Sequence, residues 1–376
     1  MLKNKKPYLI IPKLIEQPTW GGDYIVRMKG WSKVKDFDGV RIGQSYELFS
    51  GSKLLSKITS TDDPKFIGEL GSPDDSKVLN NPGYKEGEDF VNIREVTSLD
   101  DRVLLIKLNQ SNGNSFQLHI KKDIHNQRWR PKPETWYYLE DGLVTFGIRR
   151  GVNLKDYKNA CKSIEAKMKD LSSRIRNNDL SLNDARLQSE EFIRKINPWQ
   201  YVNLHIIKKH SVVDPSAGGI HHSWEEDIEN HPLGNVLYEI QKDVMDPVST
   251  IRSFDKGKIK DDGTIREIHI DDYFKYLDTD TENNDIGKIS QEKKGSSLIK
   301  NEDYVLDIFE IETEMKDKTN GSYSHLFVRE GKIKVEAEDG SVVLSAGHSC
   351  FIPENVLTYG IKSLGAKSVV LKAYIE

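Results

Sequence analysis

Four side chains of metal-binding type recur at spacings that would let strands bring them together. Gln117 and His119 lie two residues apart in an apolar run, so in a strand both point to one face. Glu134 enters the next such run, and His221 ends a Gly-rich turn at residues 216–220. An amide oxygen, a carboxylate and two imidazoles, without a thiolate, suit Zn²⁺ and also accept Mn²⁺, Fe²⁺, Co²⁺ or Ni²⁺. The sequence therefore predicts one divalent metal site with a free position for a substrate oxygen.

Short strands are predicted on either side of these residues, because the runs are rich in β-branched and aromatic residues and end at turn formers. The clearest runs are Phe116–Ile120, Trp136–Leu139, Leu143–Ile148, Val202–Ile207, Ser324–Val328, Lys332–Glu338, Ser341–Ser345, Ser349–Ile352 and Ser368–Tyr374. Asp339-Gly340 between two of them predicts a hairpin. Many short strands with close turns favour a sandwich or jelly roll over a parallel sheet. No Gly-rich phosphate loop follows a strand, which argues against a nucleotide-binding fold.

Two segments break this pattern. Apolar residues spaced alternately by three and four from Leu154 to Ile175 predict a helix, and Ser181 with Asp184 predicts the start of a second helix that runs to about Ile196. We interpret the pair as a helical hairpin packed on the sheets, with a partner-binding coiled coil as the alternative. Residues 278–303 are polar and predict a surface loop or linker, or an excursion inside one domain.

Composition excludes several functional classes. The 376 residues carry a formal net charge of −4, which argues against a general nucleic-acid or membrane-surface binder. No run approaches the ~20 apolar residues of a spanning helix, and the basic start lacks the apolar core of a signal peptide. Cys161 and Cys350 stand far apart, so a disulfide framework is not expected. We expect a cytoplasmic protein.

The order of the motifs along the chain points to a family. From residue 8 to 275 the series is similar to the zinc-dependent class I mannose-6-phosphate isomerases, with weaker similarity in the C-terminal strands. The motifs are Trp20-Gly21-Gly22, Arg41–Leu48, Leu104–Leu108, Phe116–His119, Lys132-Pro133-Glu134, Gly147–Gly151, Ala217–His221, Glu239–Gln241, Thr250–Arg252 and Arg266–Ile270.

The resemblance implies a mainly β fold of two cupin-like jelly-roll barrels with a helical insertion. The N-terminal cupin domain, which holds the metal, would comprise residues 1–150 and 197–275, and residues 151–196 would be the insertion. Residues 276–303 would link it to a C-terminal cupin-like domain at residues 304–376.

The resemblance also implies roles for single residues. Gln117, His119, Glu134 and His221, rather than His222, match the zinc ligands of the family. Arg252 matches the catalytic arginine, and Lys132, Lys107 and Glu239 match positions that line the substrate pocket. Among these residues we expect Arg252 and Lys132 to be catalytic, as cations that stabilise developing negative charge. Three departures from the usual motifs are Ile120 for proline, Gln44 for glutamate and Ile251 for tyrosine.

These residues fit aldose–ketose isomerisation. Moving a proton between C1 and C2 of an open-chain sugar passes through an enediolate, whose charge a zinc ion and nearby cations stabilise. Glu239, an activated water or a lysine with a lowered pKa is the base, and Lys107 and Lys122 are the cations available for a phosphate. We expect interconversion of mannose 6-phosphate and fructose 6-phosphate by a monomer or weak homo-oligomer. The alternatives are a sugar-binding cupin without catalysis and an isomerase of another sugar or sugar phosphate.

Overall fold

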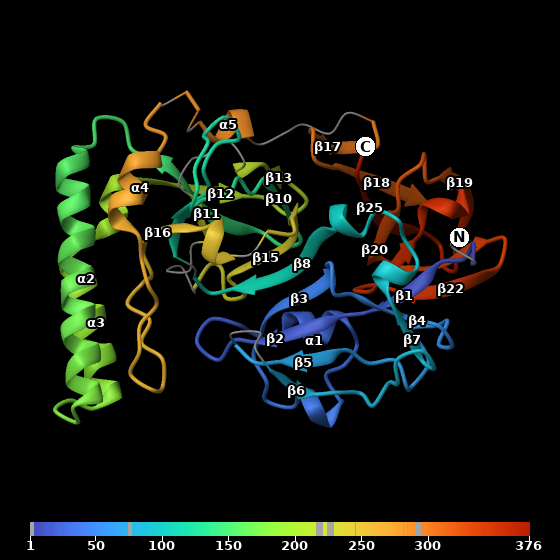
Figure 1. The fold of residues 1–376 in the computed structure, drawn as a ribbon, viewed down its shortest axis with the longest axis horizontal. Coiled ribbons are helices and arrows are strands. Elements are labelled where there is room, and N and C mark those ends of the chain that lie inside the picture. The colour runs from blue at the N-terminus through green and yellow to red at the C-terminus, as the bar shows by residue number, and fades with distance from the viewer. Residues whose placement is uncertain are drawn as a thin grey trace.

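Four β-sheets dominate the part of the chain that the structure, a computed structural model, describes (Figure 1). That part comprises residues 4–73, 77–113, 115–215, 221–223, 229–244, 246–280, 282–283, 285–289 and 295–376. The prediction of a mainly β fold is confirmed, and strands Val202–Ile207 and Ser368–Tyr374 have the predicted bounds. The Asp339-Gly340 hairpin is also present, where Ala337 pairs with Gly340.

One eight-stranded sheet carries one side of the predicted site. Its order is β13-β10-β15-β8-β3-β2-β5-β6. The strands are β13 (Val212–Val213), β10 (Glu134–Tyr138), β15 (Asn235–Lys242), β8 (Leu104–Ser111), β3 (Ile42–Leu48), β2 (Lys13–Glu16), β5 (Glu69–Gly71) and β6 (Val78–Asn80). Side chains alternate along β10: Trp136 and Tyr138 join a core with β11, whereas Tyr137 joins the larger core shared with the C-terminal strands. Glu134 shares the face of Trp136.

A five-stranded sheet carries the other side, in the order β12-β11-β14-β9-β16. The strands are β12 (Val202–Ile207), β11 (Gly142–Ile148), β14 (His221–Ser223), β9 (Phe116–Leu118) and β16 (Ile251–Phe254). Phe116 and Leu118 pack against the helices, and Val144 and Phe146 pack against Trp136 of the first sheet. Gln117, between Phe116 and Leu118, therefore points toward the first sheet.

The C-terminal strands form two further sheets. They are ordered β17-β18-β25-β20-β23-β1-β4-β7 and β19-β24-β21-β22. The strands are β17 (Ser297–Lys300), β18 (Val305–Ile311), β25 (Ser368–Tyr374), β20 (Ser324–Glu330), β23 (Ser349–Ile352), β1 (Tyr8–Ile11), β4 (Lys53–Leu55), β7 (Phe90–Asn92), β19 (Glu314–Lys318), β24 (Thr358–Ser363), β21 (Lys332–Ala337) and β22 (Gly340–Ser345). Tyr8 pairs with Phe351, so N-terminal strands complete the C-terminal sheet. Strand pairing thus crosses the predicted division at residue 304, which stays a prediction.

Helices cover the far side of the five-stranded sheet (Figure 1). They are α2 (Leu154–Arg176), α3 (Leu182–Ile196) and α4 (Ile270–Tyr276), with the shorter α1 (Tyr24–Met28) and α5 (Ile286–Ile289) elsewhere. The helical hairpin is confirmed, and the Ser181 side chain accepts the backbone N–H of Asp184 as predicted. Tyr157, Cys161, Ile164, Met168 and Leu171 of α2 face the sheet. In the described residues no helix is long and apolar enough to cross a membrane.

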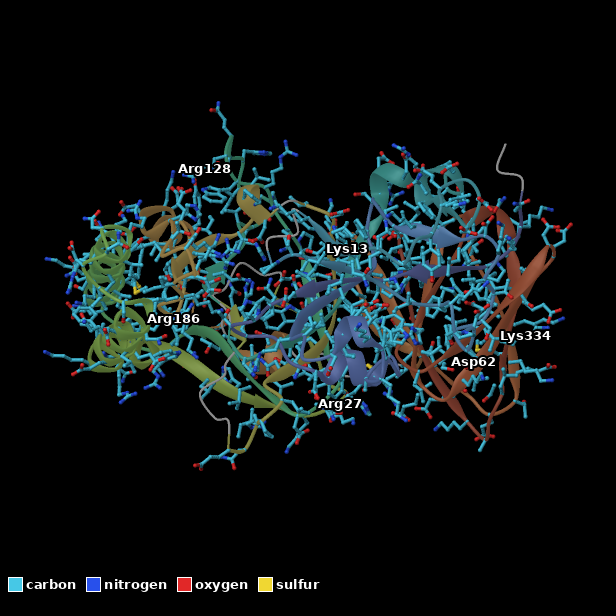
Figure 2. All side chains as sticks on the ribbon, turned by 90° about the horizontal axis from the view of Figure 1, so that it is seen from below. Lys13, Arg27, Asp62, Arg128, Arg186 and Lys334 are labelled. Carbon is cyan, nitrogen blue, oxygen red and sulfur yellow. The ribbon has the colours of Figure 1, made fainter. Side chains whose placement is uncertain are left out.

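Charged side chains surround this apolar interior, as Figure 2 shows with Arg186 on the helical hairpin and Lys334 on the C-terminal strands. An exception is the ion pair of Lys29 and Glu47, 2.7 Å apart and at most 1% exposed. Lys29 also donates to the carbonyl of Gly347, and Ser349 donates to Glu47. The pair therefore joins the N-terminal strands to the C-terminal ones through a hydrogen-bonded network, as a buried charge requires.

Two buried histidines near this pair predict how stability depends on pH. Burial lowers the pKa of His325 to about 3 and holds the pKa of His348 well below its usual value. Below about pH 6.5 the unfolded chain therefore binds protons that the folded chain excludes, so stability falls as the pH falls. Each histidine should lower the free energy of unfolding by up to about 1.4 kcal/mol for every pH unit between pH 6 and 4.

Urea unfolding of the metal-free protein at pH 7, 6 and 5 measures this loss. His325→Asn is the informative variant, because an amide can replace the bond of Nδ1 to the hydroxyl of Tyr238, 3.0 Å away. It should show a smaller loss between pH 7 and 5 than the wild type. Equal losses in both proteins would remove His325 from the explanation.

Candidate metal centre

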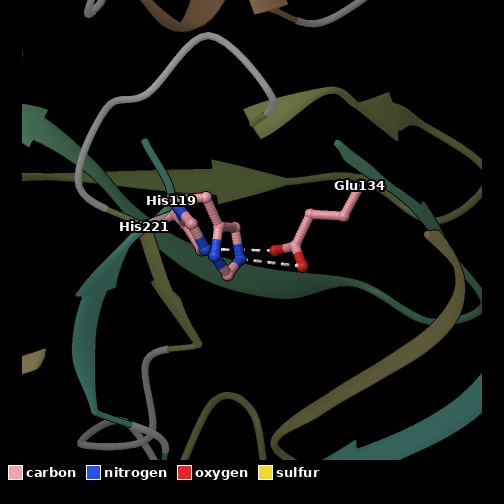
Figure 3. Close-up of side chains that lie close together, drawn as sticks. All are labelled: His119, Glu134 and His221. Atoms are coloured by element: carbon pink, nitrogen blue, oxygen red, sulfur yellow. Dashed lines mark hydrogen bonds and ion pairs between the residues drawn. The ribbon is translucent and has the colours of Figure 1, made fainter. Parts of the chain in front are cut away.

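His119, Glu134 and His221 meet in the interior between the two sheets (Figure 3). Their ligand-type atoms all lie within 4.8 Å of one another, and the side chains are at most 3% exposed. Nε2 of His119 lies 3.2 Å from Oε2 of Glu134, and Nε2 of His221 lies 3.0 Å from Oε1. Figure 3 shows the carboxylate facing both rings. The structure thus brings together three of the four predicted ligands.

Strand register explains this convergence. Gln117 on β9 pairs with His221 on β14 and, on its other side, with Arg252 on β16. Cross-strand partners share a face, so these three side chains point the same way. His119 follows β9 directly and adds a second imidazole. Glu134 comes from β10 of the opposite sheet, where its partner is Gln241.

Gln117, the fourth predicted ligand, lies beside the cluster. Its amide nitrogen is 3.3 Å from Nε2 of His221, and its amide oxygen accepts the hydroxyl of Ser115. The two amide positions are interchangeable by a rotation of the side chain. With that rotation the oxygen takes the position next to His221.

A backbone carbonyl orients His119. Nδ1 of His119 lies 2.6 Å from the carbonyl oxygen of Ser249, so Nδ1 carries the proton and donates it. The lone pair of Nε2 is then directed toward Glu134. Such a bond to the remote ring nitrogen is the usual support of a metal-binding histidine.

The cluster fits a divalent cation. Burial by itself raises the pKa of Glu134, but the charges around it, those of His119 and Lys132 above all, hold that pKa well below its usual value. Burial lowers the pKa of His119. Oε1 of Glu134 is buried and accepts no hydrogen bond from a described residue, although His221 lies 3.0 Å away. A carboxylate faced by the Nε2 lone pair of His119 is the arrangement that metal binding requires.

Cations and one further carboxylate border the cluster. Lys132 lies 3.6 Å from Glu134 and 3.8 Å from Asp246, and it is 7% exposed. Arg252 forms an ion pair with Asp246, and its Nε donates to the hydroxyl of Ser115 at 3.0 Å. Asp246 is 57% exposed, so the Arg252–Asp246 pair connects the buried cluster to solvent.

The remaining predicted residues separate into two groups. Lys107 and Glu239 are cross-strand partners on β8 and β15, 3.2 Å apart, and Asn109 also donates to Glu239. They share the inward face with Trp136, the partner of Glu239 on β10. Lys122 is instead 47% exposed and pairs with Glu302 and Asp303. This placement argues against the phosphate role predicted for Lys122.

Sequence reasoning missed three polar partners of these residues. Asp246 and Ser249 precede Arg252 in a segment without a recognisable motif. Ser115 could have been found, because it stands two residues before Gln117 and therefore on the same strand face. The Gly-rich turn at residues 216–220 and the side chain of His222 lie outside the described residues.

Comparison with known proteins identifies the fold. Residues 294–371 match the family model of the mannose-6-phosphate isomerase cupin domain. Mannose 6-phosphate isomerase from Bacillus subtilis matches with a TM-score of 0.60 at 15% identity, over 98% of this chain and 100% of that one. The chain has the mannose-6-phosphate isomerase fold. The resemblance read from the motifs is thus confirmed for the fold and for the C-terminal cupin domain, at an identity that marks a divergent chain.

Two further structures with the mannose-6-phosphate isomerase fold agree. A putative mannosephosphate isomerase from Archaeoglobus fulgidus matches with a TM-score of 0.58 at 13% identity, over 100% of both chains. The Salmonella typhimurium mannose 6-phosphate isomerase, bound to its substrate and a zinc atom, matches with a TM-score of 0.60 at 13% identity, over 98% of this chain and 100% of that one. No curated protein matches the sequence.

Proposed function

We propose that this chain is a metal-dependent isomerase that interconverts mannose 6-phosphate and fructose 6-phosphate. The observation that carries the proposal is the buried cluster of His119, Glu134 and His221, in which each carboxylate oxygen of Glu134 lies 3.0–3.2 Å from one imidazole nitrogen. It stands inside the fold of mannose-6-phosphate isomerases, of which the Salmonella enzyme binds its substrate and zinc.

We assign the metal to Gln117, His119, Glu134 and His221, with Zn²⁺ as the ion. The donor set of nitrogen and oxygen atoms suits zinc, and the support of His119 by Ser249 agrees with it. When bound, the ion supplies Lewis-acid polarisation of the carbonyl and hydroxyl oxygens at C1 and C2 of the open-chain sugar.

Side chains of the protein stabilise the developing negative charge and transfer the proton. The guanidinium of Arg252, held by Asp246 and Ser115, stabilises negative charge on the enediolate oxygens, and Lys132 adds a second positive charge from the loop before β10. A base must lie within ~3 Å of the transferred proton. Asp246, beside Lys132 and Arg252, is one candidate for this duty. Glu239 is the other, because its β10 partner Trp136 packs edge-on against His221 at 5.4 Å between ring centroids.

Lys258 replaces Lys122 in our proposal as a cation for the phosphate. It follows Arg252 by six residues, donates to the carbonyl of Gly113 and lies over the ring of Trp20. Burial lowers its pKa to about 8, and among the described residues it forms no ion pair with a carboxylate. A partly buried lysine that forms no ion pair with a described carboxylate is available for a phosphate oxygen.

Metal analysis with a coupled enzyme assay tests the proposal. Purified protein should contain about one zinc ion per chain and convert mannose 6-phosphate into fructose 6-phosphate, and chelation followed by zinc should remove and restore turnover. A panel of aldoses with and without phosphate distinguishes other substrates. Metal-free, inactive protein would reject the proposal, and ligand-dependent thermal stabilisation without product would indicate a sugar-binding cupin. The cytoplasmic location and the monomeric or weakly oligomeric state stay predictions.

A further inference from the structure

Trp129 lies in a loop just before Lys132 and is anchored to α4. It is 2% exposed, and its indole N–H donates to Asp272 at 2.9 Å. The ring of His269 contacts it edge-on at 4.8 Å between centroids, and the guanidinium of Arg128 lies over its face at 4.5 Å. Asn126 accepts its backbone N–H. These contacts surround the tryptophan and therefore fix the loop that carries it.

The loop and α4 each contact the polar site through backbone hydrogen bonds. The N–H of Arg130 donates to the carbonyl of Val248 at 2.7 Å, beside the Ser249 carbonyl that orients His119. The N–H of His269, which leads into α4, donates to the carbonyl of Arg252 at 2.6 Å. The loop of Trp129 and α4, which are joined to each other, thus contact the segments that carry Lys132 and Arg252, the two cations of the proposed mechanism.

We propose that Trp129 is a positioning residue: by binding Asp272 it holds the loop of Lys132 and the strand of Arg252 in fixed relation to each other. The inference rests on the proposed function for its catalytic consequence. The anchoring itself can be measured without turnover. Because Lys132 lies in the loop before β10 and Arg252 lies on β16 of the five-stranded sheet, no strand pairing joins the two residues, and this outer contact couples them.

A pair of neighbouring acids on α4 offers a matched comparison. Asp271 and Asp272 both lie in the first turn of α4, but Asp271 pairs with Lys158 and Lys162 instead of Trp129. Asp271→Ala and Asp272→Ala therefore each remove one negative charge from the first turn of α4. Asp272→Ala should lower kcat ~10-fold or more with KM, zinc content and melting temperature equal to those of Asp271→Ala. Trp129→Phe, which keeps the ring and removes the N–H, should act in the same direction.

The rate of trypsin cleavage in this loop measures the anchoring without any isomerase turnover. Arg130 and Lys132 each precede a proline and resist cleavage, so Arg128 reports on this loop. Cleavage after Arg128 should be several-fold faster in Asp272→Ala than in Asp271→Ala. Asp272 also lies 3.7 Å from the guanidinium of Arg128, so Trp129→Phe, which leaves that ion pair in place, should be cleaved faster than the wild type as well. Equal kcat and equal cleavage in the two variants would overturn the inference. If the wild type shows no turnover, the proposed function fails, and the cleavage rates alone decide whether Trp129 anchors the loop.

Discussion

Glu134→Gln should abolish isomerase turnover, lowering kcat/KM by ~1000-fold or more. The change removes one negative charge and keeps the shape of the side chain. It leaves Lys132 and two imidazoles without the carboxylate that faces them in the buried cluster. The site then loses the charge that attracts a divalent cation, so zinc content should fall together with activity. Mass spectrometry of the bound metal and the coupled assay measure the two losses.

Glu140→Gln is the matched control for this prediction. Glu140 follows β10, outside the cluster, and pairs with Lys209 and the hydroxyl of Tyr24. The same chemical change there should leave zinc content and turnover close to wild type. A Glu134→Gln protein that keeps one zinc ion and most of its activity would show that this carboxylate is no ligand.

Arg252→Ala should lower kcat by ~100- to 1000-fold while zinc stays bound. The guanidinium is 9% exposed, lies on the strand next to Gln117, and is the proposed partner of the developing enediolate charge. Arg252→Lys keeps the charge but loses the planar fork that binds Asp246 and Ser115 together, so its activity should be intermediate. Steady-state kinetics in both directions, with zinc analysis of each variant, measure the effect.

Arg266→Ala is a suitable control, because Arg266 forms an ion pair with Asp255 but is 43% exposed. Exposed pairs contribute little, so this variant should behave as wild type. A loss confined to KM in Arg252→Ala would assign Arg252 to substrate binding alone. Guanidinium ions added to Arg252→Ala should restore part of kcat if the charge itself is what the reaction requires.

Local patterns in the sequence predicted the secondary elements well where one rule dominated. The alternating spacing of α2 and the cap at Ser181 placed the hairpin within a residue or two, because both signals act over one turn of helix. The strand run at Phe116–Ile120 was predicted two residues too long, since β9 ends at Leu118. His119 therefore leaves the sheet, and its ring is held by the carbonyl of Ser249 instead of by strand pairing.

Pairing between distant strands was harder to predict from the sequence. The sequence offers no sign that Tyr8 pairs with Phe351 or that β1, β4 and β7 complete the C-terminal sheet. These contacts join segments far apart in the chain, where hydrophobic burial chooses the partner and any apolar strand satisfies the local pattern. For the same reason the sequence did not predict the Lys29–Glu47 ion pair or its hydrogen bond to Gly347.

The amino-acid sequence by itself determined the chemical types of the candidate ligands: two imidazoles, a carboxylate and an amide. These follow from residue type and short spacing, whereas Arg252 and Lys132 entered through the resemblance of their motifs to the family. Only the tertiary structure decided that His119, Glu134 and His221 meet within 4.8 Å, that Asp246 holds Arg252, and that Lys122 pairs with Glu302 and Asp303 at the surface. Ion pairs and ligand clusters depend on distances of a few ångströms between chain segments, and two facing sheets, unlike any local pattern, set those distances.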